Sequence, residues 1–208
     1  MVQKEQGEEM SSREKILSAV RANQPELTAL PDIEPLKSYG DKEDLLAQYT
    51  TVATNIGAKV YEVKNVDEVK MIIQNNFGTG KRIVSTIAEL KDIADTKEYL
   101  SDLPVQLADV ELAILGSDLA VAENGAIWIT EEQMGQRALP FITQHLAVIV
   151  NARNIVATMH DAYSSIGITN QGFGAFIAGP SKTADIEQSL VIGAHGPRSM
   201  NLFLVNED

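Results

Sequence analysis

Residues 59–85 read KVYEVKNVDEVKMIIQNNFGTGKRIVS, and this stretch decides the fold. Lys59–Val63 has the alternating pattern of a β-strand, and Arg82–Ser85 predicts a second, shorter strand. Between the two strands, apolar residues recur at helical spacing until Gly78 provides a stop: Val66, Val69, Ile72, Ile73 and Phe77. A strand, a helix and a strand in this order favour a sheet with parallel neighbours.

The flanking segments continue this alternation of predicted helices and strands. An apolar helical pattern runs from Leu45 to Ile56 and stops at Gly57. On the other side, Thr86 and Glu89 fit a capping box, which predicts a helix that ends near Ala94. Further along we expect short strands at 104–107, 111–115, 126–130, 146–150, 175–178 and 202–205, and helices at 131–136, 159–165 and 183–190. The sequence therefore predicts one α/β/α domain over residues 41–208.

Residues 1–40 have a different character. Ser11 and Glu14 fit a capping box, and the helix that follows has one apolar face. Three prolines make the next stretch an extended connector: Pro25, Pro31 and Pro35. We interpret residues 1–40 as a helical arm and linker. The arm either packs on its own domain or docks onto a partner subunit.

Composition and charge exclude several classes of protein. The 208 residues carry a formal net charge of -12, which disfavours general affinity for nucleic acid but leaves room for a small anion at a local site. No cysteine is present, which excludes disulfides, a thiol nucleophile and an iron–sulfur cluster held by this chain. No apolar stretch approaches the ~18 residues of a membrane helix. The first ten residues are polar and acidic, so we expect no secretory signal and a cytoplasmic location.

Two turns near the carboxyl end are candidate ligand-binding sites. In the first, Gly179 and Pro180 follow a predicted strand, and Ser181-Lys182-Thr183 open a predicted helix whose N-terminus favours an anion. Asp185 caps this helix or points at a ligand hydroxyl. A capped helix with an exposed lysine would explain the same residues without any ligand.

The second turn holds His195 between Gly193 and Gly196, and Arg198 follows. His195 can donate a proton, and Arg198 can clamp a carboxylate or phosphate. Open α/β sheets bind ligands at the carboxyl ends of their strands, and the two turns can face one crevice. A role in stabilising the turn alone is equally open for His195. We expect a structural role for His145, because it precedes an apolar strand, and His160 is also a poorer candidate.

A third turn contains Glu123, Asn124 and Gly125. Asn-Gly is a typical tight-turn dipeptide, so this segment is explained by turn formation alone. Held beside main-chain N–H groups, Glu123 can also act as a base, a nucleophile or a ligand anchor. No spacing of His, Asp and Glu resembles a metal site.

Together these turns resemble the LUD-domain family, and within it the lactate-utilisation group. The resemblance is carried by residues 179–187 (GPSKTADIE), 193–197 (GAHGP), Glu123 with Gly125, and 137–140 (RALP). It departs from the expected pattern at Lys182, where arginine is usual. Lysine cannot make the bidentate contact of arginine, so the ligand can differ.

The resemblance implies both a fold and a role. The fold is a Rossmann-like three-layer α/β/α sandwich similar to the phosphosugar-isomerase and CoA-transferase group. The role is that of a subunit in L-lactate oxidation to pyruvate, beside an iron–sulfur partner and a second subunit. With the turns above, we expect a small carboxylate or phosphate ligand, held by Gly125, the 179–183 turn, Asp185, Gly196 and Arg198, with Glu123 and His195 as candidate catalytic residues.

A second resemblance supports an alternative. Glu123-Asn124-Gly125 is similar to the serine-glutamate-asparagine-glycine motif of class I CoA-transferases, with Ala122 in place of the serine. In that family the glutamate forms a thioester with CoA. The alternative function is therefore a CoA-transferase-like or phosphosugar-type enzyme that uses Glu123.

Overall fold

A computed structural model describes residues 11–32, 44–78, 80–96, 103–166, 172–184 and 190–206, and only the backbone of Ala184 and Leu190. The chain forms two compact units, Met1–Pro35 and Leu36–Asp208. The boundary predicted between residues 40 and 41 lies outside the described residues, so it stays a prediction.

The described part of the first unit, residues 11–32, includes the helix α1 (Ser12–Ala22). The predicted capping box is present: the Ser11 hydroxyl accepts from Glu14 N at 3.3 Å, and Glu14 Oε2 accepts from Ser11 N at 2.7 Å. The bond from Ser11 N, together with one that the Ser11 hydroxyl donates to Glu14 Oε2 at 2.9 Å, holds the pKa of Glu14 below its usual value. The helix therefore begins where the sequence predicts it.

The second unit is built on a five-stranded, wholly parallel sheet. Its order is β1 (Lys59–Val63), β11 (Ser199–Val205), β6 (His145–Asn151), β3 (Leu112–Ser117) and β2 (Ile83–Ser85). The strand farthest along the chain, β11, thus pairs with β1 on one side and β6 on the other. Because a parallel sheet is buried on both faces, its central strands are almost continuously apolar.

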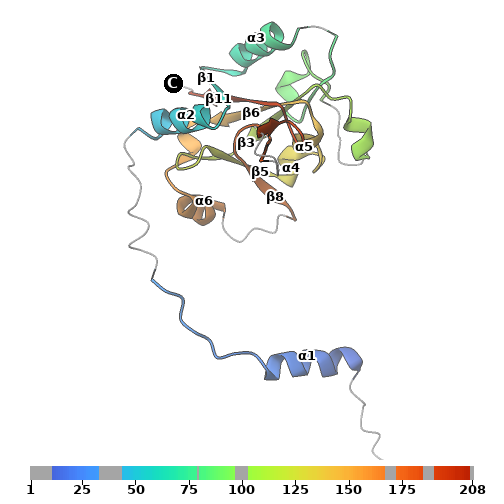
Figure 1. The fold of residues 1–208 in the computed structure, drawn as a ribbon, viewed down its shortest axis with the longest axis vertical. Helices are drawn as coiled ribbons and strands as arrows, with labels where there is room; N and C mark the ends of the chain where they lie inside the picture. The colour runs from blue at the N-terminus through green and yellow to red at the C-terminus, as the bar shows by residue number, and fades with distance from the viewer. Residues whose placement is uncertain are drawn as a thin grey trace, which may run out of the picture. The chain divides into compact units, whose positions relative to one another are not determined.

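Helix α3 (Val66–Phe77) covers one face of this sheet (Figure 1). Asn65 caps the helix by accepting from Glu68 N at 3.1 Å. Val69 and Ile73 lie on its buried side and pack against the α3-facing side chains of the strands. Phe203 of β11 is the largest of these and is fully buried. The short 3₁₀ helix η2 (Ala88–Leu90) adds Leu90 to the same core.

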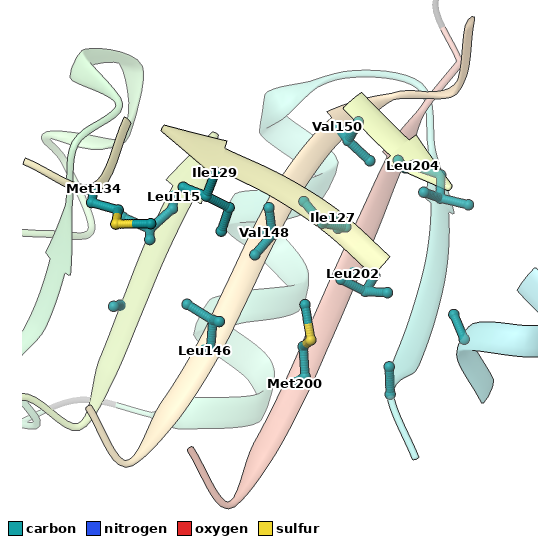
Figure 2. Close-up of a cluster of buried hydrophobic side chains, with 14 of the residues drawn as sticks. Leu115, Ile127, Ile129, Met134, Leu146, Val148, Val150, Met200, Leu202 and Leu204 are labelled. Carbon is teal, nitrogen blue, oxygen red and sulfur yellow. The ribbon is translucent and has the colours of Figure 1, made fainter. Parts of the chain in front are cut away.

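The opposite face is covered by α2 (Leu45–Asn55) and by a second sheet. The second sheet has the order β7 (Ile155–Val156), β4 (Leu119–Val121), β5 (Ala126–Thr130) and β8 (Gly174–Ile177). Figure 2 shows Ile127 and Ile129 of β5 lying across side chains of the parallel strands, among them Val148 and Leu202. This layer holds the larger hydrophobic core.

Helix α6 (Met159–Ile166) closes the outer side of the second sheet through Ala162 (Figure 1). The remaining elements are short: η3 (Pro104–Leu107), α4 (Glu131–Met134), α5 (Leu139–Ile142), η4 (Ala152–Asn154), β9 (Lys182–Ala184) and β10 (Leu190–Ile192). A mostly parallel central sheet flanked by helices confirms the predicted Rossmann-like three-layer α/β fold. The sequence did not predict that a second sheet would share one of the flanking layers.

Three predicted elements were wrong. Residues 86–94 form only η2, because the Thr86 hydroxyl donates to Gln133 O at 2.8 Å and caps nothing in its own segment. Residues 104–107 form the 3₁₀ helix η3, which Pro104 begins at a position where its missing N–H costs nothing. Residues 182–184 and 190–192 form the antiparallel pair β9–β10, where a helix over 183–190 was expected.

Among the described residues, no helix is both long and apolar enough to cross a membrane. The cytoplasmic location stays a prediction.

Candidate functional site

Two of the predicted turns meet at the end of α2. Gly125 has φ of +70° and Gly179 has φ of +73°, a region that favours glycine. A Cβ on Gly125 would lie 2.9 Å from Ile56 Cδ1, and one on Gly179 would lie 2.8 Å from the Ile56 carbonyl oxygen. Both glycines therefore let a turn approach the α2 backbone closely, which is a packing role.

The 179–183 turn also contacts the 193–198 turn. Ser181 N donates to Pro197 O at 2.9 Å, and Gly193 N donates to Ser181 O at 3.0 Å. Gly196 lies against Ser181, since a Cβ on Gly196 would come within 3.1 Å of Ser181 Cβ. The two turns that the sequence nominated as parts of one site are thus neighbours. Pro180 is buried and packs near Gly57.

The anion site at a helix N-terminus was wrong. Lys182 and Thr183 belong to strand β9, so no helix dipole is aimed at a ligand there. The Ser181 amide is engaged by Pro197 O, so it is not available to hold an anion. Lys182 is exposed, and Asp185 lies outside the described residues.

Arg198 and His195 lie close to the amino ends of the parallel strands. Their turn leads directly into β11, and Arg198 N donates to Gln144 O, the residue before β6, at 2.8 Å. Both side chains are exposed. The ligand-binding residues predicted in this turn therefore face the edge of the sheet opposite to the carboxyl edge at which α/β sheets usually bind ligands.

Glu123 has a defined structural partner. Its Oε2 accepts from Met159 N, the first amide of α6, at 2.8 Å, while its own N–H donates to Ala157 O at 3.0 Å. Thr158 and Asp161 complete the cap of the same helix through reciprocal hydrogen bonds. A carboxylate at a helix N-terminus stabilises the helix, so Glu123 is explained by capping α6.

A pocket lies at the amino edge of the parallel sheet, beneath the C-terminal end of α3. Its volume is about 660 Å³. The strands contribute polar side chains from their first residues, and the end of α3 contributes Phe77 and Gly78. The polar lining residues are Lys59, Asn75, Asn76, Lys81, Glu111, His145, Ser199 and Asn201.

His145, for which the sequence predicts a structural role, is one of the lining residues and has two polar neighbours. Its Nδ1 is 2.7 Å from Ser199 Oγ, and its Nε2 is 3.8 Å from Glu111 Oε1. Glu111 in turn forms an ion pair with Lys81. The sequence signal that could have found the group is a polar residue at or just before the start of three separate apolar strands.

The electrostatics of the pocket favour a neutral imidazole. Burial lowers the pKa of His145; Glu111 opposes this, whereas Lys81, Arg198 and Lys59 lower the pKa further. The pKa of Glu111 is also lowered, chiefly by its hydrogen bond to Lys81. At neutral pH the pocket therefore combines an ionised carboxylate, an uncharged histidine and several cations.

The lowered pKa of His145 predicts a pH-dependent stability. An unfolded histidine titrates at pH ~6.5, so acidification first protonates the unfolded state. The free energy of unfolding should then fall as the pH drops from about 7.5 through 6.5 and level off below the folded pKa. Urea unfolding of wild type and His145→Asn between pH 7.5 and 5.5 measures this, and the variant should show the smaller decrease. His160→Asn, at an exposed position, is the control; an equal slope in His145→Asn and wild type would contradict the prediction.

A smaller pocket of about 370 Å³ lies at the carboxyl ends of β2 and β3. Thr86, Asp118, Thr130 and Gln133 are among the residues that line it, and Gln133 Nε2 donates to Asp118 Oδ2 at 2.7 Å. None of the residues predicted for the site lines this pocket. Among the described residues, no cluster of three His, Asp or Glu side chains is arranged to hold a metal ion.

The sequence is similar to curated bacterial proteins. It is 30% identical to Lactate utilization protein C of Shouchella clausii over 64% of this chain and 58% of that protein. It is 25% identical to Lactate utilization protein C of Oceanobacillus iheyensis over 94% of this chain and 98% of that protein. The chain thus spans little more than half of the first relative and nearly all of the second.

A solved structure shows the same fold. The crystal structure of a DUF162 family protein from Deinococcus radiodurans superposes with a TM-score of 0.61 at 17% identity, over 79% of this chain and 98% of that one. The model of the LUD domain family matches residues 83–205, which run from β2 to β11 and include Glu111, His145 and Ser199. The chain belongs to the LUD-domain family.

Proposed function

We propose that this protein is a subunit of an L-lactate utilisation system, in which lactate is oxidised to pyruvate together with an iron–sulfur partner and a second subunit. The observation that carries the proposal is family membership together with similarity to Lactate utilization protein C over 98% of that relative's length. These 208 residues contain no cysteine, so they cannot themselves hold a thiolate-ligated cluster.

The contribution proposed for this chain is binding a small carboxylate or phosphate at the amino edge of the parallel sheet. Lys59 and Lys81 line the pocket there. The positive charge of Arg198 lowers the pKa of two other lining residues, Glu111 and His145. In a chain of net charge -12, such a local concentration of cations is what an anionic ligand requires. Arg198, which the sequence nominated, is not among the residues that line the pocket, but its charge lowers the pKa of two residues that are.

Removing Arg198 tests the binding part of the proposal. Each charged hydrogen bond to an anion contributes about 1.5–3 kcal/mol, so Arg198→Ala should weaken binding about ten- to a hundredfold. Calorimetry with L-lactate and inorganic phosphate on wild type, Arg198→Ala and His195→Ala measures the effect. The control is Arg137→Ala, because that guanidinium already pairs with Glu131 at 2.6 Å. Unchanged affinity in Arg198→Ala with the fold intact would place the anion elsewhere.

The physiological part is tested by growth. A deletion strain without a paralogue should fail to grow on L-lactate as sole carbon source and should recover when this chain is supplied on a plasmid. Co-purification from lactate-grown cells should then recover an iron–sulfur protein. Unimpaired growth of the deletion strain would overturn the proposal.

The alternative, a CoA-transferase-like enzyme acting through Glu123, has a direct test of its own. Such an enzyme forms a thioester between the glutamate and CoA, which borohydride reduces and mass spectrometry locates. The capping bond to Met159 N occupies only Oε2 of Glu123, so the carboxylate is not fully engaged.

A further inference from the structure

Three side chains in the amino-edge pocket form a chain of polar contacts. Ser199 and His145 are paired in register on the adjacent strands β11 and β6, and Glu111 immediately precedes the next strand, β3. The α3-facing core contains Phe203 and Ala147, which lie an even number of residues beyond Ser199 and His145, so the two polar side chains share the α3-facing side of the sheet. Three parts of the chain that are distant in sequence are therefore juxtaposed by sheet topology.

The contacts have the order carboxylate, imidazole, hydroxyl. Glu111 Oε1 is 3.8 Å from His145 Nε2, and His145 Nδ1 is 2.7 Å from Ser199 Oγ. A neutral imidazole with its proton on Nε2 faces the carboxylate with a donor and accepts the serine hydroxyl on Nδ1. This assignment leaves the serine proton directed at a base, which is the arrangement that activates a serine nucleophile.

The surroundings fix this geometry. The edge of the Phe77 ring contacts the imidazole, with 5.4 Å between ring centroids and an interplanar angle of 62°. Lys81 holds Glu111 in its ionised form through their ion pair. In the part of the chain that the structure describes, the charges that act on the pKa of His145 are those of Glu111, Lys81, Arg198 and Lys59, and among these Glu111 alone raises it.

The hydroxyl opens onto a cavity large enough for a substrate. The pocket of about 660 Å³ is lined by Ser199 and also by Lys59 and Asn201, which are cross-strand partners of each other. Pockets of this size accommodate small organic molecules. Lys59 and Asn201 supply a cation and an amide, which suit an acyl group that carries a carboxylate or a phosphate.

We propose that Ser199 is a nucleophile and His145 its general base in an acyl-transfer site whose substrates are small anionic esters or thioesters. Ser199 Oγ attacks the acyl carbon while its proton moves to His145 Nδ1, and that proton then leaves with the alcohol or thiol. Water next attacks the acyl-serine, gives a proton to His145, and releases the carboxylic acid as Ser199 regains its proton. Glu111 is a positioning residue. This activity uses the same pocket as the proposed anion binding, but it does not require a role in lactate utilisation.

Labelling with a fluorophosphonate probe tests the nucleophile in the intact wild-type chain. The probe should label Ser199, identified by mass spectrometry of the labelled peptide, and Ser199→Ala should lose the label. Ser164→Ala is the matched control, because the Ser164 hydroxyl instead donates to a backbone carbonyl, His160 O, at 2.8 Å. No label on wild-type Ser199, or a label on another serine, would overturn the proposal.

Hydrolysis of p-nitrophenyl acetate tests the other two residues. His145→Asn should lower the rate by about 100-fold or more, because general-base catalysis contributes on that scale. Glu111→Gln should move the apparent pKa of the rate profile to lower pH, since Glu111 raises the pKa of His145. An unchanged rate in folded His145→Asn would refute the proposal, and an unmoved profile in Glu111→Gln would remove Glu111 from it. Circular dichroism of each variant confirms folding.

Discussion

Replacing Phe203 by alanine is expected to lower the free energy of unfolding by about 3–5 kcal/mol. Phe203 is fully buried in the middle of the parallel sheet and stacks on Tyr61 of β1, with ring centroids 5.1 Å apart and an interplanar angle of 15°. Its ring also belongs to the core that α3 closes with Val69 and Ile73. Truncation to alanine therefore removes packing contacts among β11, β1 and α3. The close-packed sheet cannot collapse far enough to fill the cavity.

Urea unfolding at pH 7.5 measures this loss. The matched control is Phe141→Ala, because Phe141 keeps 41% of its surface exposed in α5 and should cost less than about half as much. Equal losses in the two variants would contradict the assignment of Phe203 to the central core.

Replacing Gly179 by alanine should cost about 2–4 kcal/mol, although only one methyl group is added. Two effects combine at this position. The φ of +73° is unfavourable for a residue with a Cβ, and the added carbon would lie 2.8 Å from the carbonyl oxygen of Ile56. Because that oxygen belongs to the backbone at the end of α2, it cannot move aside as a side chain would.

Gly80→Ala separates the two effects. Gly80 has φ of +89°, yet a Cβ there would meet nothing within 4 Å, so only the backbone strain of about 1–2 kcal/mol applies. Thermal unfolding of both variants should show the larger decrease for Gly179→Ala. If Gly80→Ala loses as much stability, the close approach of Gly179 to the Ile56 carbonyl oxygen adds nothing to the cost of Gly179→Ala.

The central α/β unit was predictable because its residues satisfy local rules. Strand β1 begins and ends where its alternating pattern places it, and helix α3 follows its apolar spacing from Val66 and ends at Gly78. Propensity and turn chemistry act over a few residues, so the sequence reveals them directly. The same is true of β5, whose predicted range of 126–130 agrees with the structure.

Two of the three wrong elements have hydrogen-bond partners outside their own segment. Thr86 resembles a helix cap, but its hydroxyl is engaged by Gln133 O, 47 residues away. Lys182–Ala184 resembles the start of a helix, but it pairs with Leu190–Ile192. Local patterns carry no information about such partners, so tertiary contacts overrode them.

The residues of the candidate site also differ in how far the sequence could reveal them. Gly125 and Gly179, predicted as ligand-binding residues, both approach Ile56 closely in the structure; their part in ligand binding stays a prediction. His145, Ser199 and Glu111 each look unremarkable in their own segment. Only the order of the strands, β11 beside β6 beside β3, brings the three together.

The position of β11 also has a consequence for how the chain folds as it is synthesised. The β1–β11 register pairs Lys59 with Asn201, so the parallel sheet remains split into β1 on one side and β6, β3 and β2 on the other until the ribosome has made β11. During that interval β1 and β6 both present open backbone edges. Closing so long a loop is entropically costly and slow. The nascent domain therefore depends on protection of these two edges, and any interruption of translation before β11 leaves an aggregation-prone intermediate.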